Sequence, residues 1–400
     1  MFYLLPPAGT PISCRDIWKT LQLRLASGHR EGLFAQKISD FSSAKNCYFL
    51  NTGRTAQSVL LNALFRLSSS GKKEVVIPAY TCFSVAASIA RVGLRIRLID
   101  IDPLTMDYDY NSLQNIDRHK VLAVIACNLF GIISDWERLW HIGKEKGLFL
   151  IDDAAQSLGS VFNNCPSGTL GDVGFYSLDR GKGLSTYAGG VLITNRKELA
   201  DCINRIVESF PQPGLIMEGI TLIKLLLYGL FLHPHLYWIP NMFPFLGLGE
   251  TKYDEKFPIA RLTRLQYCAG SVMFEKLAQL HSIRSANSRK LAEEIFPLDC
   301  FQVPGYNTNN CPVYLRLPVL ALDRVARDRA VSALRQIGVV ASNMYPSTIR
   351  EIPGIDRHLA LPKDHFPGAR QVVERLFTLP THPYVRDNDI KKIVSCLRRI

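Results

Sequence analysis

The chain has 400 residues, of which 47% are hydrophobic and 20% charged, and 47 basic against 35 acidic residues give it a net charge of +12. This length suits two domains, and the composition excludes a disordered, a collagen-like and a coiled-coil chain. The positive charge favours anionic partners such as phosphorylated metabolites or an anionic membrane face. Because the basic residues are scattered along the chain, we do not expect nucleic-acid binding.

The first half of the chain alternates short apolar strands with helical patterns. After a turn at 51–55 the predicted elements are a helix at 56–67, a strand at 74–80, a helix at 83–92, strands at 95–102 and 121–127, a helix at 134–146 with Ser134 as its N-cap, strands at 148–152, 173–178 and 190–194, and a helix at 196–210. Near-continuous Val, Ile and Leu runs between helices indicate strands buried on both faces, and therefore a mostly parallel sheet. Ligands of such sheets bind at the carboxyl ends of the strands.

Residues 215–249 are unusually apolar. Between Glu218 and Glu250 the only formal charge is Lys224. Pro234 ends the first apolar run, and Pro240 and Pro244 interrupt the second, so the segment does not form one straight membrane span. Two interpretations remain open: a helix that lies on a bilayer surface, or a helix that packs against protein as an oligomer interface or a lid.

The second half of the chain has a different pattern. A long amphipathic segment at 259–291 precedes predicted strands at 299–305, 311–322 and 339–345 and predicted helices at 323–338, 368–377 and 387–397. We therefore expect an N-terminal arm at 1–45, a large α/β domain at 46–284 with an apolar insert at 215–249, and a small C-terminal α+β domain at 285–400.

The cysteines and the N-terminal residues bear on the cellular compartment. None of the ten cysteines forms a CxxC pair or a zinc-ligand spacing, so we expect no metal site. Cys127 ends an apolar run, which predicts a buried free thiol. Residues 1–13 lack a basic region and contain Pro6 and Pro7, unlike a signal peptide. We expect a cytoplasmic protein, with contact to the cytoplasmic face of a membrane through 215–249 as the open alternative.

Three segments carry residues suited to chemistry. Residues 51–56 form a Gly-containing turn before a helix, where backbone N–H groups suit an anion and Thr55 adds a hydroxyl. Asp152 and Asp153 close a buried strand, where a carboxylate needs a cation, a metal or a protonated ring. Lys182 lies in a Gly-flanked turn, where a desolvated lysine can attack a carbonyl. Taken singly, each also has a purely structural interpretation: a helix cap, a turn-capping aspartate and a solvated lysine.

The order of these segments resembles the DegT-type sugar aminotransferases. The Gly-x-Thr turn at 53–55 is followed by IPAYTC at 77–82, IDDAAQ at 151–156 and S-x-x-x-G-K at 177–182, with later landmarks at 344–346 and 379–383. The resemblance implies an enzyme that depends on pyridoxal 5′-phosphate (PLP) and has the aspartate-aminotransferase fold type I. It also implies a homodimer, because the family builds its active site at a dimer interface.

The resemblance assigns roles to single residues. Lys182 corresponds to the lysine that binds the cofactor covalently and moves the proton during transfer, and Asp153 to the carboxylate that pairs with the pyridine nitrogen. The other residues that it places at the cofactor are Gln156 near the ring hydroxyl, Ser177, Arg54 and Thr55 at the phosphate, and Cys82 or Phe83 over the ring.

The implied reaction transfers an amino group from an amino acid, expected to be glutamate, to a keto-sugar, expected to be nucleotide-linked, in polysaccharide or glycolipid biosynthesis. The net charge of +12 agrees with a diphosphate-bearing substrate. The alternatives are a PLP enzyme of another type, namely a sugar dehydratase or a non-sugar aminotransferase, and a non-catalytic membrane-attached partner in glycan assembly. Lys182 argues against the dehydratases, whose branch of the family has histidine in its place.

Overall fold

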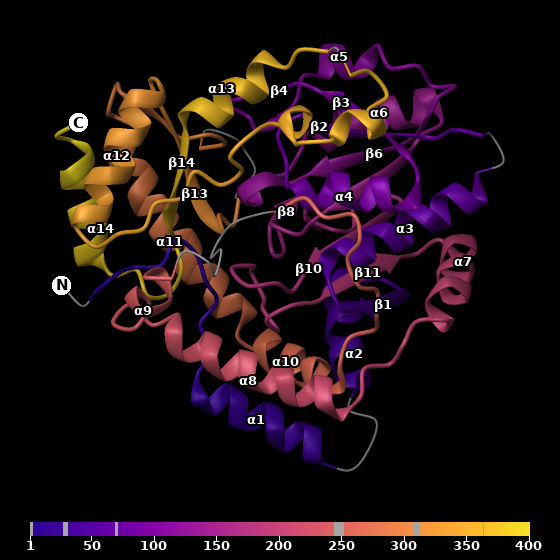
Figure 1. Ribbon diagram of the computed structural model, residues 1–400, viewed down its shortest axis with the longest axis horizontal. Coiled ribbons are helices and arrows are strands. Elements are labelled where there is room, and N and C mark those ends of the chain that lie inside the picture. Colours follow the sequence, from indigo (N-terminus) through magenta and orange to yellow (C-terminus); the bar gives the residue numbers. More distant parts are fainter. Residues whose placement is uncertain (1–2, 27–30, 69–70, 244–251, 307–311, 363) are drawn as a thin grey trace.

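A seven-stranded sheet forms the centre of the larger part of the molecule (Figure 1). The computed structural model describes residues 3–26, 31–68, 71–243, 252–306, 312–362 and 364–400. The strand order in the sheet is β1 (Asn46–Leu50), β11 (Gly190–Thr194), β10 (Val173–Ser177), β7 (Phe149–Asp153), β6 (Val121–Cys127), β2 (Glu74–Pro78) and β3 (Arg95–Ile99). Only β11 runs against its neighbours, so the predicted mostly parallel α/β sheet is confirmed.

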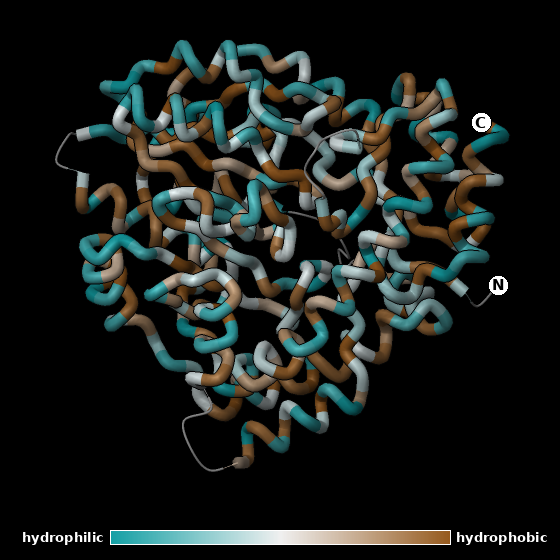
Figure 2. The backbone as a smooth tube through the Cα atoms, turned by 180° about the vertical axis from the view of Figure 1, so that it is seen from behind, coloured by the Kyte–Doolittle hydropathy of each residue, from teal (hydrophilic) through white to brown (hydrophobic). Residues whose placement is uncertain are grey.

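Burial explains why these strands read as continuous apolar runs. Every residue of β2, β6, β10 and β11 is buried, since helices cover the sheet on both faces. The helices of this part are α3 (Gly53–Leu67), α4 (Phe83–Val92), α5 (Tyr110–Gln114), α6 (Trp136–Lys146) and α7 (Lys197–Glu208). Figure 2 shows hydrophobic residues through the interior and hydrophilic residues along the outer helices. Cys127 is buried and free, as predicted.

Two local predictions in this part are wrong. The N-cap of α6 is Asp135 rather than Ser134, because the Asp135 carboxylate accepts from the Arg138 N–H. The strand predicted at 95–102 is interrupted at Asp100, whose carboxylate accepts two N–H groups at the start of α13 (Pro367–Arg375). The chain continues as β4 (Ile101–Asp102), which pairs with β5 (Asp107–Tyr108). A second short pair joins β8 (Val161–Phe162) to β9 (Cys165–Pro166).

The C-terminal part is built on a three-stranded antiparallel sheet of β12 (Phe301–Gln302), β13 (Arg316–Ala321) and β14 (Leu376–Pro380). Helices α12 (Arg324–Gln336), α13 and α14 (Asp387–Leu397) pack around it. The strand predicted at 339–345 is wrong, because only isolated bridges form there, from Val339 to Leu5 and from Ser342 to Thr378. The predicted helix 368–377 ends at Arg375, where β14 begins. Cys311, at the start of one predicted strand, lies outside the described residues.

The remaining helices pack beside the large sheet, and α11 (Leu277–Ile295) also contacts β13 and α14 of the C-terminal part. The predicted arm contains α1 (Cys14–Leu25) and α2 (Glu31–Ser42), and the amphipathic segment forms α10 (Arg264–Phe274) and α11. Helix α11 crosses the proposed domain boundary at 284–285. One cluster of buried side chains, which includes Ile125 of β6, Leu317 of β13 and Ile393 of α14, runs from the large sheet to the C-terminal helices. The two sheets therefore share a core.

The apolar segment forms α8 (Leu215–Phe231) and the short α9 (Trp238–Asn241). In Figure 1, α8 lies beside α1 and over α10, and both of these helices contact it. Residues 244–249 of the predicted insert lie outside the described residues. In the part of the chain that is described, no helix is long and apolar enough to cross a bilayer.

Candidate active site

A cavity of about 790 Å³ lies at the carboxyl ends of β2, β6, β7 and β10. This is the edge at which parallel α/β sheets bind ligands. It brings together all of the predicted site residues except Thr55: Arg54, Cys82, Asp153, Gln156, Ser177 and Lys182. Thr55 is fully buried behind the cavity, with its hydroxyl 3.0 Å from the Thr52 hydroxyl. Its contact with an anion therefore remains a prediction.

The two aspartates at the end of β7 occupy different environments, because successive side chains of a strand face opposite sides of the sheet. Asp153 lines the cavity, and its Oδ1 accepts the Ala155 N–H at 3.0 Å. Asp152 is fully buried and accepts from Asn128 Nδ2 at 2.7 Å and from the Gly168 and Leu170 N–H groups at 2.5 and 3.1 Å. Only Asp153 can meet a ligand.

Burial raises the pKa of both carboxyl groups. It raises the pKa of Asp152 to about 7, against hydrogen bonds that favour the ionised form. It raises the pKa of Asp153 to about 6, opposed by the Ala155 N–H and by the nearby positive charge of Lys182. Asp153 therefore stays mostly ionised at neutral pH and is placed to bind a cationic group.

The start of α3 forms a cradle, defined by Gly53, Gln57 and Ser177, that suits an anion. A Cβ placed on Gly53 would lie 3.3 Å from the Ser177 hydroxyl, and one on Gly190 would lie 2.5 Å from the Thr52 carbonyl oxygen. These glycines thus allow the start of α3 to approach the end of β10 and the start of β11 closely. Gln57, one turn into α3, lines the cavity, and its buried Nε2 has no hydrogen-bond partner among the described residues. A buried donor without a partner is costly, so the cradle suits a ligand with acceptor oxygens.

Lys182 follows β10 on a turn that the N-terminal segment supports. Gly181 has a left-handed backbone with φ of 76°, and the Lys182 N–H donates to the Asp179 carbonyl at 3.2 Å. The Thr10 hydroxyl donates to the Lys182 carbonyl. Lys182 and Asp153 thus reach the same cavity from the ends of neighbouring parallel strands.

The opposite side of the cavity carries sulfur and aromatic groups. Cys82, the N-cap residue of α4, lines the cavity, whereas the adjacent Phe83 packs its ring 6.1 Å from that of Tyr345. Gln156 donates from Nε2 to the Tyr345 hydroxyl at 3.2 Å and accepts the Phe130 N–H at 3.3 Å. Of the two residues predicted over a ring, the structure therefore places Cys82 at the cavity.

Arg316, which the sequence did not single out, enters the cavity from the first residue of β13. Its Nη1 lies 3.1 Å from the Met344 sulfur, and its Nη2 lies 3.7 Å from the position of a Cβ on Gly181. No carboxylate of the described residues forms an ion pair with it. Burial lowers its pKa, while the nearby Tyr345 and Tyr237 oppose that shift. A partly buried cation without a counter-charge among the described residues, next to the Lys182 turn, suits an anionic group of a ligand.

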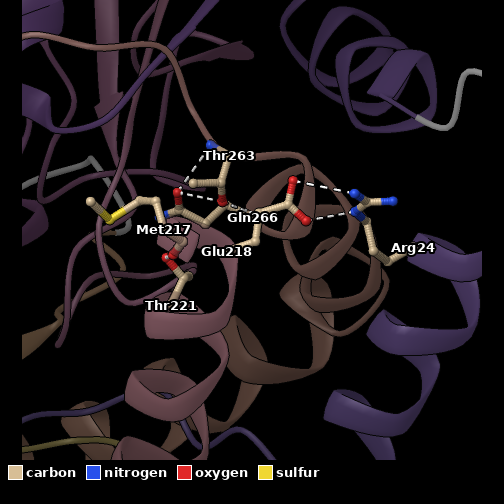
Figure 3. Close-up of polar contacts among 6 residues, drawn as sticks. All are labelled: Arg24, Met217, Glu218, Thr221, Thr263 and Gln266. Atoms are coloured by element: carbon tan, nitrogen blue, oxygen red, sulfur yellow. Dashed lines mark hydrogen bonds and ion pairs between the residues drawn. The ribbon is translucent and has the colours of Figure 1, made fainter. Parts of the chain in front are cut away.

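The apolar segment supplies the outer wall of the cavity. The wall residues are Lys224, Leu227, Tyr228, Phe231, Leu232, Tyr237 and Pro240. Figure 3 shows how the start of α8 is attached: Glu218 accepts from Arg24 of α1 at 2.7 and 3.4 Å, next to the capping box of Thr263 and Gln266 that begins α10. The inner face of α8 therefore packs against protein, in agreement with one of the two open interpretations.

Comparison with known proteins agrees with this geometry. The chain matches the model of the DegT/DnrJ/EryC1/StrS aminotransferase family over residues 14–217 and 245–398. It is 25% identical to the UDP-2-acetamido-2-deoxy-3-oxo-D-glucuronate aminotransferase of Pseudomonas aeruginosa over 90% of this chain and 88% of that protein. It is 36% identical to the pleiotropic regulatory protein of Geobacillus stearothermophilus, but over only 41% of this chain and 44% of that protein.

Solved structures confirm the fold. Helicobacter pylori PseC, an aminotransferase involved in the biosynthesis of pseudoaminic acid, superimposes with a TM-score of 0.79 at 15% identity, over 99% of this chain and 98% of that chain. A DegT DnrJ EryC1 StrS aminotransferase from Brucella abortus gives a TM-score of 0.74 at 23% identity, over 96% and 94%. The predicted fold class and the family resemblance are confirmed.

Proposed function

The chain belongs to the DegT/DnrJ/EryC1/StrS aminotransferase family, and we propose that it transfers an amino group from an amino acid, with glutamate as the expected donor, to a nucleotide-linked keto-sugar. The observation that carries this proposal is the convergence of Lys182 and Asp153 on one cavity at the strand ends. The Pseudomonas relative, whose name specifies a UDP-linked oxo-sugar, supports the substrate class. The product would serve polysaccharide or glycolipid biosynthesis.

The residues of the cavity fit PLP. Lys182 would bind the aldehyde carbon, and Asp153 would pair with the pyridine nitrogen. The phosphate would lie in the cradle of Gly53, Ser177 and Gln57, with Arg54 at the edge of this cradle. The unpartnered Gln57 amide is the observation that favours an oxygen-rich ligand there. Gln156 would lie near the ring hydroxyl and Cys82 beside the ring. When bound, PLP supplies an electron sink for the charge that develops at the substrate carbon as its proton leaves.

The residues of this chain then divide the remaining work. The Asp153 carboxylate would keep a proton on the ring nitrogen, because it is itself mostly ionised at neutral pH. The Lys182 amine would take the proton from the amino carbon of the donor and return it to the acceptor carbon at the later stage. Arg316, beside the same turn, is positioned to bind the carboxylate of the amino donor and so orient its amino carbon.

A half-reaction assay tests this function. L-Glutamate should abolish the near-visible absorbance of the PLP-loaded protein, and a UDP-linked or GDP-linked keto-sugar should restore it. Release of water from the sugar without amino transfer would indicate a dehydratase. Restoration by a simple keto acid alone would indicate a non-sugar aminotransferase, and the absence of any cofactor band would favour a non-catalytic partner in glycan assembly.

We also propose a homodimer in the cytoplasm, as the family resemblance implies. Its test is the mass in solution, which should be twice the 44.9 kDa of the chain. A monomer that retains full activity would contradict it.

A further part of the proposal is contact of the protein with the cytoplasmic face of a membrane through an α1/α8 face, defined by the outward side chains of these two helices. Its exposed apolar residues are Trp18, Leu25, Leu215, Ile216, Ile220, Ile223, Leu226 and Leu230. Arg15 and Lys19 are exposed beside them, whereas the carboxylates of the two helices are already paired, Asp16 with Lys276 and Glu218 with Arg24. An apolar face with basic and no unpaired acidic side chains suits an anionic bilayer surface.

A further inference from the structure

Residues 218–244 are not matched by the family model, yet they form the outer wall of the active-site cavity. Helix α8 contributes a lysine, a tyrosine and two apolar side chains to this wall, and the segment after it contributes Leu232, Tyr237 and Pro240. Any ligand that passes this wall meets side chains that the family pattern does not specify. The wall is therefore where recognition particular to this chain can arise.

The wall is fixed to the turn that carries Lys182. The Tyr228 hydroxyl accepts the Thr10 N–H at 3.0 Å, and Thr10 in turn donates to the Lys182 carbonyl. A Cβ on Gly229 would lie 2.6 Å from the Ile12 carbonyl oxygen, so α8 touches the N-terminal segment backbone to backbone. This seating places the side chains of α8 at a defined distance from the reacting lysine.

Two cations of the cavity lie against one tyrosine ring. Lys224 Nζ lies 5.6 Å and Arg180 Cζ 5.1 Å from the centroid of the Tyr187 ring, and Tyr228 packs edge-on against the same ring at 6.2 Å. Tyr187 has a left-handed backbone with φ of 73°, which costs a non-glycine residue free energy. Such strain often persists at ligand sites.

Neither cation has its charge well neutralised. Lys224 forms no ion pair with any described carboxylate, and it carries the only formal charge between Glu218 and Glu250. Arg180 contacts Asp179 at 3.8 Å, and both side chains are about half exposed, which makes the pair weak. The mouth of the cavity thus holds two cations on a rigid aromatic support. One of them is two residues from Lys182.

We propose that Lys224, Arg180 and Tyr187 form a subsite for the diphosphate of the nucleotide-linked keto-sugar. This inference rests on the proposed function and adds the residues that recognise the acceptor. A diphosphate carries at least two negative charges. It therefore pairs with two separate cations better than a singly charged carboxylate would. It is attached directly to the sugar ring, so a diphosphate at Arg180 leaves the ring within reach of Lys182.

Titration of inorganic pyrophosphate by calorimetry tests the subsite without turnover. The PLP-loaded protein is first reduced with borohydride. The cofactor phosphate then stays in the cradle at α3, and pyrophosphate cannot bind there. Lys224→Gln and Arg180→Gln should each weaken pyrophosphate binding about tenfold, and Lys224→Arg should restore most of it. Added salt should weaken binding to the wild type more than to either Gln variant. Lys391→Gln, an exposed lysine on α14, is the matched control and should change nothing.

The outcomes separate this inference from the proposed function. Unchanged pyrophosphate binding in Lys224→Gln would overturn the subsite. So would an equal loss of D-glucuronate binding in Lys224→Gln, because the subsite would then bind carboxylates and not specifically a diphosphate. Failure of the proposed function would be seen at the reduction step, because borohydride would then attach no cofactor to the protein. Pyrophosphate binding to that unreduced protein would still report on Lys224.

Discussion

The two sides of the cavity differ in origin and in what they contribute. The inner side is built from strand ends and tight turns that carry Asp153, Ser177 and Lys182, and the family model covers these three residues. The outer side is α8 with the segment after it, and the family model leaves residues 218–244 unmatched. Helix α8 presents Lys224 and Tyr228 together with apolar side chains to the cavity, and exposed apolar side chains on its outer face. On the proposals above, the strand ends set the chemistry, whereas the added helix selects the acceptor substrate and brings the enzyme to a membrane surface.

The largest expected effect on the rate comes from a substitution on the inner side of the cavity. Lys182→Ala should lower the rate of amino transfer by about a thousandfold or more, because it removes the amine that we propose moves the proton. Steady-state assays with glutamate and a nucleotide-linked keto-sugar measure it. Lys224→Gln, on the outer side, should keep its kcat and its cofactor content, and an equal loss of kcat in that variant would contradict the division.

The adjacent aspartates provide a matched pair of variants. Asp153→Asn should lower kcat by about 100-fold or more, since it removes the charge that keeps the ring nitrogen protonated. Asp152→Asn should instead lower thermal stability, because Asp152 binds the Gly168 and Leu170 N–H groups and does not face the cavity. A larger kcat loss in Asp152→Asn than in Asp153→Asn would show that the wrong carboxylate has been assigned.

The pH dependence of kcat should sharpen the same assignment. Burial raises the pKa of Asp153 to about 6, so the carboxylate is ionised above this pH and neutral below it. Because a positively charged ring nitrogen beside Asp153 would lower this pKa, activity should fall only as the pH drops to about 6 or below, and this acid limb should disappear in Asp153→Asn. A wild-type profile that stays flat to pH 5 would mean that bound PLP or Lys182 holds the pKa much lower.

The smallest expected effect concerns the outer side. Leu226→Gln combined with Leu230→Gln should weaken binding to vesicles that contain anionic lipid about tenfold or more, because both exposed side chains would lose apolar burial. Cosedimentation measures it, and cofactor content should not change. Leu361→Gln, an exposed leucine far from α8 in sequence, is the control. The membrane proposal would be contradicted if the wild-type protein did not bind such vesicles and buried its α1/α8 face in the dimer interface.

Sequence reasoning succeeded where local pattern and burial coincide. The strands of the large sheet are buried on both faces, so their runs were visible, and the polar residues after them had to meet at one edge of the sheet. It failed where a tertiary contact decides the outcome. Asp100 interrupts a strand in order to cap α13, and residues 339–345 form only isolated bridges.

The same distinction applies to the site. Asp153 and Lys182 lie in motifs, whereas Arg316 opens an apolar strand of the C-terminal sheet and reaches the cavity only because the two parts pack together. Tyr228 and Lys224 were included in an apolar segment whose inward face could not be known before α8 was placed. These residues could not be predicted from the sequence because they lie far along the chain from the motifs that identify the site.

Borohydride reduction followed by peptide mapping tests the central claim most directly. Among the described residues three lysines line the cavity, namely Lys182, Lys224 and Lys252, so two other lysines could be labelled instead of Lys182. Reduction of the PLP-loaded protein should place the cofactor on the peptide that contains Lys182, and Lys182→Ala should carry no covalent label. Labelling of Lys224 or Lys252 in the wild type would contradict the assignment of Lys182 as the residue that holds the cofactor.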